Sequence, residues 1–314
     1  MIDPGQVRAR LRSKPVAIAG FLVGLVLVLG AIATVMRNSD IAAARDAVRE
    51  APAWMLALAI VLPALNWLLI SASFVVLNRR YARVGIGEMA ALIGSAWLLN
   101  YLPLRPGMIG RLAYHKKVNG IHFRDSAKVL VQGIVCTAAS GVLLVFSAVA
   151  FQGSEPLVWL GVGAATLSVL GLAAIAVLPR GPHLWRWPVA MAIRYLHLTV
   201  WAVRYAVVFA LVGHPISPGA AVAIAAASQI VMLIPLTGNG LGATEWVVGL
   251  TAGTMHRSVL SATGLLAALV NRAAEMLVAV PVGLICYLWV VRAIPRHAAS
   301  QPTPNTTQNK IESS

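Results

Sequence analysis

One short stretch combines residue types that bind anions. Residues 100–111 read NYLPLRPGMIGR and place Arg105 and Arg111 on either side of Gly107. A helix broken at these prolines leaves unpaired backbone N–H groups at the start of its second half, and such groups bind anions. Glycine lets a phosphate approach the backbone closely, and arginine binds phosphate with a bidentate fork. The stretch therefore predicts a site for a phosphate, such as a phospholipid headgroup. Arg111 by itself could equally be a basic anchor at the membrane surface, whereas Arg105 lies deeper, between two prolines.

A second stretch, IPLTGNGLGATE at residues 234–245, contains a similar break and an acidic group. Its residues Asn239, Gly240, Gly242 and Glu245 complete the candidate site. A carboxylate at membrane depth is costly unless it is paired, so Glu245 requires a cation. The candidates are Arg204 and Arg272, both inside apolar segments. Arg272 could instead form a local ion pair with Glu275, three residues later, which leaves Arg204 as a cavity residue or as the partner of Glu245.

Composition defines the class of protein to which these residues belong. The 314 residues are 59% hydrophobic and 11% charged, with a mean hydropathy of +0.80, which excludes a soluble domain with one core. The apolar runs are continuous, which favours membrane-spanning helices over a β-barrel. The net charge of +15 does not indicate nucleic-acid binding, because the basic residues lie at the ends of apolar runs.

Residues suited to metal binding or covalent catalysis do not cluster. Cys136 and Cys286 both lie in apolar runs, and the seven histidines have no ligand-like spacing. No carboxylate pair is present, and no serine or threonine is accompanied by a base. We therefore expect no metal, no cofactor and no catalytic residues.

The charge pattern predicts a topology. A basic, cytoplasmic N-terminus at residues 1–14 precedes the first crossing, and a polar, disordered cytoplasmic tail occupies residues 293–314. The loop after the first crossing is charge-neutral and is expected to form a short amphipathic helix on the outer surface. The last run is too long for one straight crossing and is expected to begin as a tilted or broken helix. The predicted crossings are residues 15–36, 53–77, 126–151, 157–178, 195–213 and 258–291.

Two further apolar segments are predicted to enter the membrane and return. If residues 86–111 crossed it, Lys116 and Lys117 would lie outside, against the bias of basic residues toward the cytoplasm. A re-entrant helical hairpin removes this conflict, and residues 220–254 form the second such segment. The predicted fold is an all-α polytopic membrane protein with about six transmembrane helices and two re-entrant hairpins.

The two halves of the chain have the same order of parts in opposite orientations. Residues 15–151 form the first repeat and residues 152–292 the inverted second repeat, with Pro103 and Pro235 at corresponding positions. Inverted repeats broken at matching positions are typical of transporters with a substrate site near the midplane. The alternative is that proline and glycine serve only helix packing. Further polar residues within the spans could line the same cavity or bond between helices: Asn66, Gln132, Gln229 and Asn271.

These motifs carry a resemblance to a known family. NYLPLRPGMIGR and IPLTGNGLGATE, together with the later NRAAEM, are similar to the membrane domain of the lysylphosphatidylglycerol synthase/flippase family, and the similarity extends over residues 15–292. The matching positions are Asn100, Pro103, Gly107, Arg111, Gly240, Leu241, Gly242, Glu245 and Arg272. Many members have an acidic residue where this chain has Met108. The resemblance implies movement of phospholipid or lipid-linked material between leaflets, and it does not imply aminoacyl transfer, which belongs to a separate soluble domain.

Together these observations predict a flippase-like lipid transporter in the bacterial cytoplasmic membrane, with both termini in the cytoplasm. The expected ligand is an anionic phospholipid headgroup. The alternative is a non-transporting membrane partner or anchor for a lipid-linked glycosyltransferase or another envelope-lipid enzyme, and small-residue faces are compatible with a homo-oligomer. The expected binding residues are Asn100, Arg105, Gly107, Arg111, Arg204, Asn239, Gly240, Gly242, Glu245 and Arg272.

Overall fold

Helices account for the regular structure of the chain. The computed structural model describes residues 4–38, 41–102, 105–150, 185–233, 238–255 and 261–299, and these contain no strand. The predicted all-α class is therefore confirmed. The helices are α1 (Pro4–Asn38), α2 (Ile41–Glu50), α3 (Ala53–Asn78), α4 (Ile86–Leu99), α5 (Pro106–Val118), α6 (Phe123–Ala150), α8 (Arg186–Leu211), α9 (Pro218–Leu233), the 3-10 turn η1 (Gly238–Gly240), α10 (Ala243–Met255) and α11 (Ser261–Ala299).

Several helices are suited to crossing a membrane. Within the described ranges three are long and apolar enough: Ala53–Asn78, Phe123–Val149 and Ala262–Ala293. A fourth span results if Phe21–Arg37 and Ile41–Glu50, which are bent by 92° relative to each other, are counted as one. The chain is thus a multi-pass membrane protein. The expected crossing at residues 157–178 lies outside the described residues, and α8, which contains most of the expected crossing at 195–213, is not among these spans. The number of six therefore stays a prediction.

The terminal helices extend beyond the boundaries expected from sequence. α1 begins at Pro4, so most of the basic segment before residue 15 is already helical. The charge-neutral loop does contain a helix, α2. α11 runs unbroken from Ser261 to Ala299, so no break interrupts it in that range, and it continues past residue 293. Its 39 residues span about 58 Å, much more than the ~30 Å hydrocarbon layer. Residues 300–314 lie outside the described part of the chain.

α4 and α5 form a tight helical hairpin whose open ends lie together. At these ends, the Asn119 side-chain amide after α5 donates to Glu88 Oε1 in the first turn of α4, at 2.9 Å. At the tip, the Met108 N–H donates to Asn100 Oδ1 at 3.1 Å, so the residue that ends α4 caps the start of α5. Gly107 permits this packing, because a Cβ there would lie 2.5 Å from the backbone of Ala96.

α9, η1 and α10 form the second interrupted segment. Asn239, Gly240 and Gly242 have φ values of 49°, 73° and 77°, a left-handed conformation that glycine and asparagine adopt most readily. This explains why the sequence GNGLG occupies the turn. The tip of this segment meets the tip of the first hairpin: a Cβ on Gly238 would lie 2.6 Å from the carbonyl oxygen of Tyr101.

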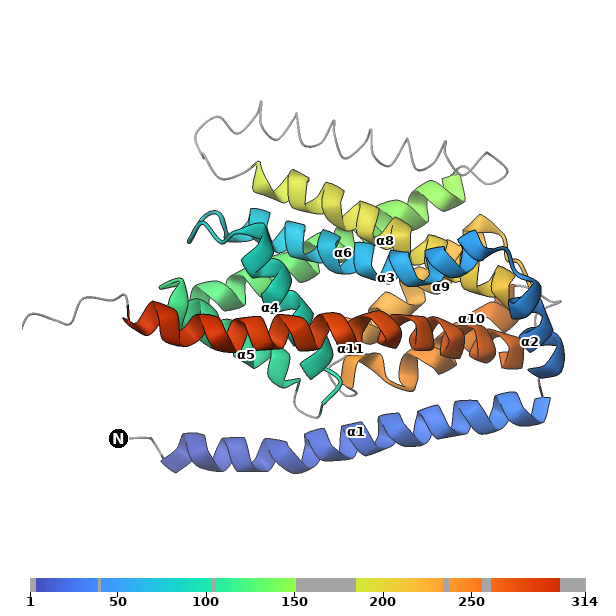
Figure 1. The fold of residues 1–314 in the computed structure, drawn as a ribbon, viewed down its shortest axis with the longest axis horizontal. Helices are drawn as coiled ribbons and strands as arrows, with labels where there is room; N and C mark the ends of the chain where they lie inside the picture. Colours follow the sequence, from blue (N-terminus) through green and yellow to red (C-terminus); the bar gives the residue numbers. More distant parts are fainter. Residues whose placement is uncertain are drawn as a thin grey trace, which may run out of the picture.

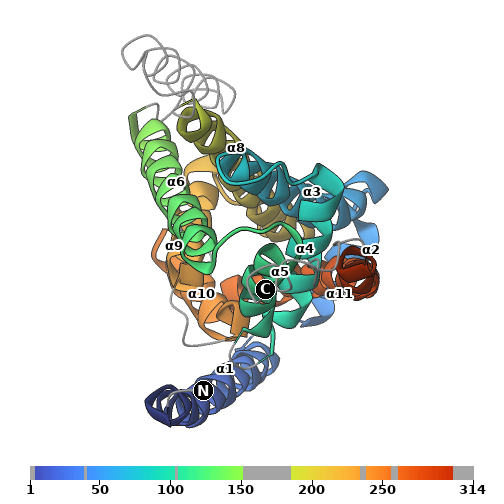
Figure 2. The same ribbon diagram turned by 90° about the vertical axis from the view of Figure 1, so that its left-hand side faces the viewer.

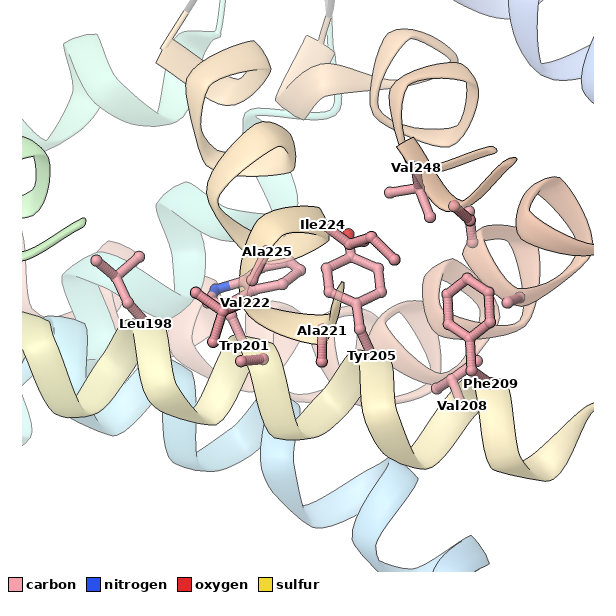
Figure 3. Packing of buried hydrophobic residues seen from close by; sticks show 14 of the residues in the cluster. Leu198, Trp201, Tyr205, Val208, Phe209, Ala221, Val222, Ile224, Ala225 and Val248 are labelled. Carbon is pink, nitrogen blue, oxygen red and sulfur yellow. The ribbon is translucent and has the colours of Figure 1, made fainter. Parts of the chain in front are cut away.

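The apolar core holds these broken segments in place. α8 packs along α3 on one side and against α9 on the other (Figure 1). Figure 3 shows Trp201 and Tyr205 of α8 next to small residues of α9, Ala225 and Ala221. Because the α9 residues are small, the helices approach closely. In the end-on view α4 and α5 lie within the bundle, and α1 lies at its edge (Figure 2).

Candidate functional site

A cavity lined by both apolar and polar side chains lies where the two broken segments meet. Its volume is about 280 Å³, roughly that of nine water molecules at ~30 Å³ each. The first hairpin contributes Trp97, Asn100, Met108 and Arg111, and the second broken segment contributes Gln229 and Asn239. The surrounding helices contribute Asn66, Phe74, His197, Trp201, Arg204 and Glu275 among others. The cavity can hold a small polar group but not two acyl chains.

Glu275 organises one wall of the cavity. Its Oε2 accepts a hydrogen bond from Arg204 at 3.1 Å, and its Oε1 accepts from the Tyr101 hydroxyl at 2.8 Å and from Trp97 Nε1 at 3.1 Å. Arg204 also donates to Asn271 Oδ1 at 3.1 Å, and its guanidinium lies 3.9 Å from the centre of the Trp201 ring. Arg204 and Glu275 are 2% exposed each, so their opposite charges offset each other away from bulk solvent.

A second buried ion pair, Arg272 with Glu245, lies next to Glu275 but does not line the cavity. Arg272 Nε donates to Glu245 Oε1 at 2.6 Å, which joins α11 to the first turn of α10. Arg272 Nη1 also donates to the Tyr101 hydroxyl at 3.3 Å and lies 3.8 Å from Glu275 Oε1. Tyr101 therefore links both ion pairs into one network that connects the first hairpin, the second broken segment, α8 and α11.

Arg111 is a buried cation of a different kind. It is 8% exposed and lines the cavity, and its guanidinium lies 4.2 Å from the centre of the Phe74 ring. Arg194, 5% exposed, lies 4.9 Å from the same ring. Among the described residues no carboxylate lies within 4 Å of either arginine. Of the described acidic side chains, Glu245 and Glu275 are buried, and both are bound by other arginines. The cavity therefore has an excess of positive charge.

Neutral polar groups complete the lining. In the orientation that satisfies its amide, Asn66 donates to the His197 carbonyl at 3.0 Å and to His197 Nδ1 at 3.1 Å, and it accepts from Trp201 Nε1 at 3.3 Å. Gln229 of α9 lines the opposite side. These groups can exchange hydrogen bonds with a bound polar molecule without adding charge.

The structure brings some of the expected site residues together and places others nearby. Asn100, Arg111, Arg204 and Asn239 line the cavity. Glu245 and Arg272 lie behind it as an ion pair, so Arg272 rather than Arg204 is the partner of Glu245. Gly107, Gly240 and Gly242 shape the two breaks without lining the cavity. Arg105 is half-buried at the start of α5 with a left-handed φ of 45° and does not line the cavity either.

Sequence reasoning about the other polar residues was partly right. Of the two roles considered for them, Asn66 and Gln229 line the cavity, Asn271 binds Arg204 from α11, and Gln132 lines a separate surface depression. The local pair of Arg272 and Glu275, one of the arrangements considered from the sequence, has the longer contact, and the shorter contact of Glu275 is with Arg204. Trp97 and Tyr101 were missed. Their spacing of four residues just before the break was a usable signal, since it places both on one face of α4 and of the turn that continues it.

The helices and the cavity define a multi-pass α-helical membrane protein with a charged internal site. The family model of the lysylphosphatidylglycerol synthase transmembrane region matches residues 21–283, so the chain belongs to this family. The resemblance inferred from the broken motifs is thereby confirmed. No curated protein matches the chain.

Proposed function

We propose that this protein moves an anionic phospholipid, or a lipid-linked phosphate, between the leaflets of the bacterial cytoplasmic membrane. The observation that carries the proposal is Arg111, a buried cation that faces the cavity with no described carboxylate within 4 Å. Arg204 and Arg272 have acidic partners, whereas Arg111 lacks one. Because an unpaired buried charge is costly, a bound anion would stabilise the site.

The size and position of the cavity support a headgroup as the ligand. A volume of about 280 Å³ accommodates a phosphate with a small substituent, so the acyl chains would remain in the lipid. Apolar residues on the outer faces of α6 and α11, such as Phe146 and Ile285, are 67% and 68% exposed and would face the surrounding lipid. The ligand would thus be held by its polar end only.

Movement across the membrane follows from the two broken segments. Asn100 and Met108 of one segment and Asn239 of the other line the same cavity, so a displacement of one segment against the other would change the side from which the cavity opens. If the two halves form an inverted repeat with both termini in the cytoplasm, this displacement provides alternating access. The proposed action involves no covalent step and no cofactor.

Transfer of labelled lipid in proteoliposomes tests the proposal. Fluorescent phosphatidylglycerol or phosphatidylcholine is incorporated into both leaflets. A quencher added outside reaches only the outer leaflet, so loss of the inner-leaflet fluorescence measures transfer of each lipid. We expect protein-dependent quenching of the inner-leaflet phosphatidylglycerol and at least a tenfold slower rate for Arg111→Gln, since charged hydrogen bonds contribute about 1.5–3 kcal/mol. Arg80→Gln, which removes an exposed arginine outside the cavity, is the matched control and should not slow transfer.

The outcome also separates this proposal from its alternative. Equal rates for wild type and Arg111→Gln would contradict the assignment of the cavity. Absence of transfer by a wild-type protein that still binds phosphatidylglycerol would favour the second interpretation, a membrane partner that presents lipid to an envelope-lipid enzyme.

A further inference from the structure

A second hollow lies outside the cavity, at the basic end of α3. Its lining residues come from the end of α3 and from the starts of α4 and α8, and its volume is about 670 Å³. Its basic lining residues are Arg79, Arg83 and Arg186, and among the described residues that line it none is acidic. The hollow shares no lining residue with the headgroup cavity. It is therefore a separate positively charged site.

Contacts with neighbouring groups hold two of the arginine guanidinium groups in place beside this hollow. Arg186 is buried, and its Nη1 donates to the Leu77 carbonyl at 3.3 Å, which fixes the guanidinium at the end of α3. The Arg79 guanidinium lies 5.6 Å from the centre of the Trp185 ring, a cation–π contact that restricts its position. Among the described residues no carboxylate lies within 4 Å of Arg79 or Arg83.

Backbone N–H groups in the first turn of α4, at the edge of the hollow, are further hydrogen-bond donors. Gly85 precedes α4 and caps it with no side-chain hydrogen bond, so the first N–H groups of the helix remain available. The acidic residue of this turn, Glu88, does not line the hollow, because its carboxylate accepts from Asn119 on α5. A phosphate in the hollow would therefore meet arginine and backbone donors, and the described lining residues include no carboxylate.

The rest of the wall is apolar and lies at the membrane boundary. Val75, Val84 and Ile86 line the hollow beside the arginines, and Ile86 is 54% exposed. α3 is one of the membrane-spanning helices, so its basic end marks an interface between lipid and water. A free phosphate would use only the charged part of this surface, whereas a lipid would also contact the apolar part.

We propose that this hollow binds the phosphate of an anionic phospholipid from the leaflet on the basic side of the protein. The arginines assign this side to the cytoplasm. This lipid stays bound where α3, α4 and α8 meet. It is a different molecule from the lipid that enters the cavity. The inference does not depend on transport, since no residue of the cavity takes part.

Native mass spectrometry of the full-length protein in detergent, titrated with phosphatidylglycerol, tests this site. The measurement is made in Arg111→Gln protein, so that binding in the cavity is weakened. Addition of Arg79→Gln and Arg83→Gln should lower the affinity for the remaining phosphatidylglycerol at least about tenfold. Addition of Arg80→Gln and Arg124→Gln removes two arginines from a neighbouring depression and should leave the affinity unchanged.

Three results would overturn the proposal. Equal weakening by both double substitutions would indicate diffuse surface charge, and no weakening by either would indicate that the hollow binds no lipid. Displacement of phosphatidylglycerol by millimolar inorganic phosphate, with phosphate binding lost on substitution of Arg79 and Arg83, would identify a soluble anion as the ligand. If Arg111→Gln alone does not reduce the binding of phosphatidylglycerol, the proposal that the cavity binds this lipid is contradicted. The comparison of the two double variants still tests the hollow.

Discussion

Gly238 packs directly against the carbonyl of Tyr101, so that a Cβ at position 238 would lie 2.6 Å from that oxygen. The two residues belong to different broken segments, and their contact is the point where the tips of these segments meet. Tyr101 also bonds Glu275 and Arg272, so this contact sets the position of the charged network. A shift at the contact would be transmitted to both ion pairs.

Replacing Gly238 with alanine should therefore separate the two tips. We expect a loss of about 1–3 kcal/mol of stability, as for other overpacked sites, and slower lipid transfer. Thermal unfolding of the purified protein measures the first effect and the liposome assay the second. Gly110→Ala is the control, because a Cβ there meets nothing within 4 Å, and it should be neutral or stabilise α5 by up to about 1 kcal/mol. Equal stability of the two variants would show that the tips do not need to touch.

The pair Arg272 and Glu245 should respond asymmetrically to substitution. Arg272→Gln leaves Glu245 buried without its cation and should cost about 3–5 kcal/mol. Glu245→Gln should cost less, because Arg272 still lies 3.8 Å from Glu275. The double variant should be more stable than Arg272→Gln alone, with a coupling of about 1–3 kcal/mol. Apparent unfolding temperatures of the three variants provide the comparison, and strictly additive effects would contradict a direct pair.

Arg111→Lys should retain part of the binding that Arg111→Gln loses. Lysine keeps the positive charge, but it lacks the bidentate fork and the planar group that lies over Phe74. We expect affinity for phosphatidylglycerol between that of wild type and that of Arg111→Gln, measured by native mass spectrometry. Wild-type affinity in the lysine variant would mean that charge alone matters, and affinity equal to that of the glutamine variant would mean that the fork is indispensable.

Single cysteines test whether the first hairpin re-enters the membrane. Gly87, before the hairpin, and Lys117, after it, are exposed, and the contact between Glu88 and Asn119 holds these ends together. Cysteines at both positions should therefore be labelled from the same side by a membrane-impermeant maleimide. Labelling from opposite sides would mean that α4 and α5 together cross the membrane. The background protein lacks Cys136 and Cys286, which are both buried.

The same method tests the orientation of the second half. His214, in the exposed turn between α8 and α9, should be labelled from the side opposite to Lys117 when each is replaced by cysteine. This expectation follows from the basic residues around Lys117 and their scarcity around His214. Labelling of both from one side would contradict the inverted arrangement of the two halves.

Much of the architecture followed from local patterns. Continuous apolar runs predicted helices in a membrane, and the prolines and glycines near residues 103–107 and 238–242 predicted two breaks, both of which are present. The extent of the terminal helices did not follow, because α1 and α11 continue through segments that composition alone would place outside the membrane. Helix continuation there depends on backbone hydrogen bonds, which charged and polar residues also permit.

The sequence by itself determined the class of the protein, its family and the residue types available for binding an anion. Only the tertiary structure decided which charges remain unpaired. Arg204 reaches Glu275 across 71 residues and Arg272 reaches Glu245 across 27, whereas Arg111 faces the cavity beside Phe74. These pairings depend on which faces of separate helices pack together, and hydrophobic periodicity carries no information about that choice. Arg105, Arg111 and Arg204 look alike in the sequence, and burial and the placement of the carboxylates distinguish them.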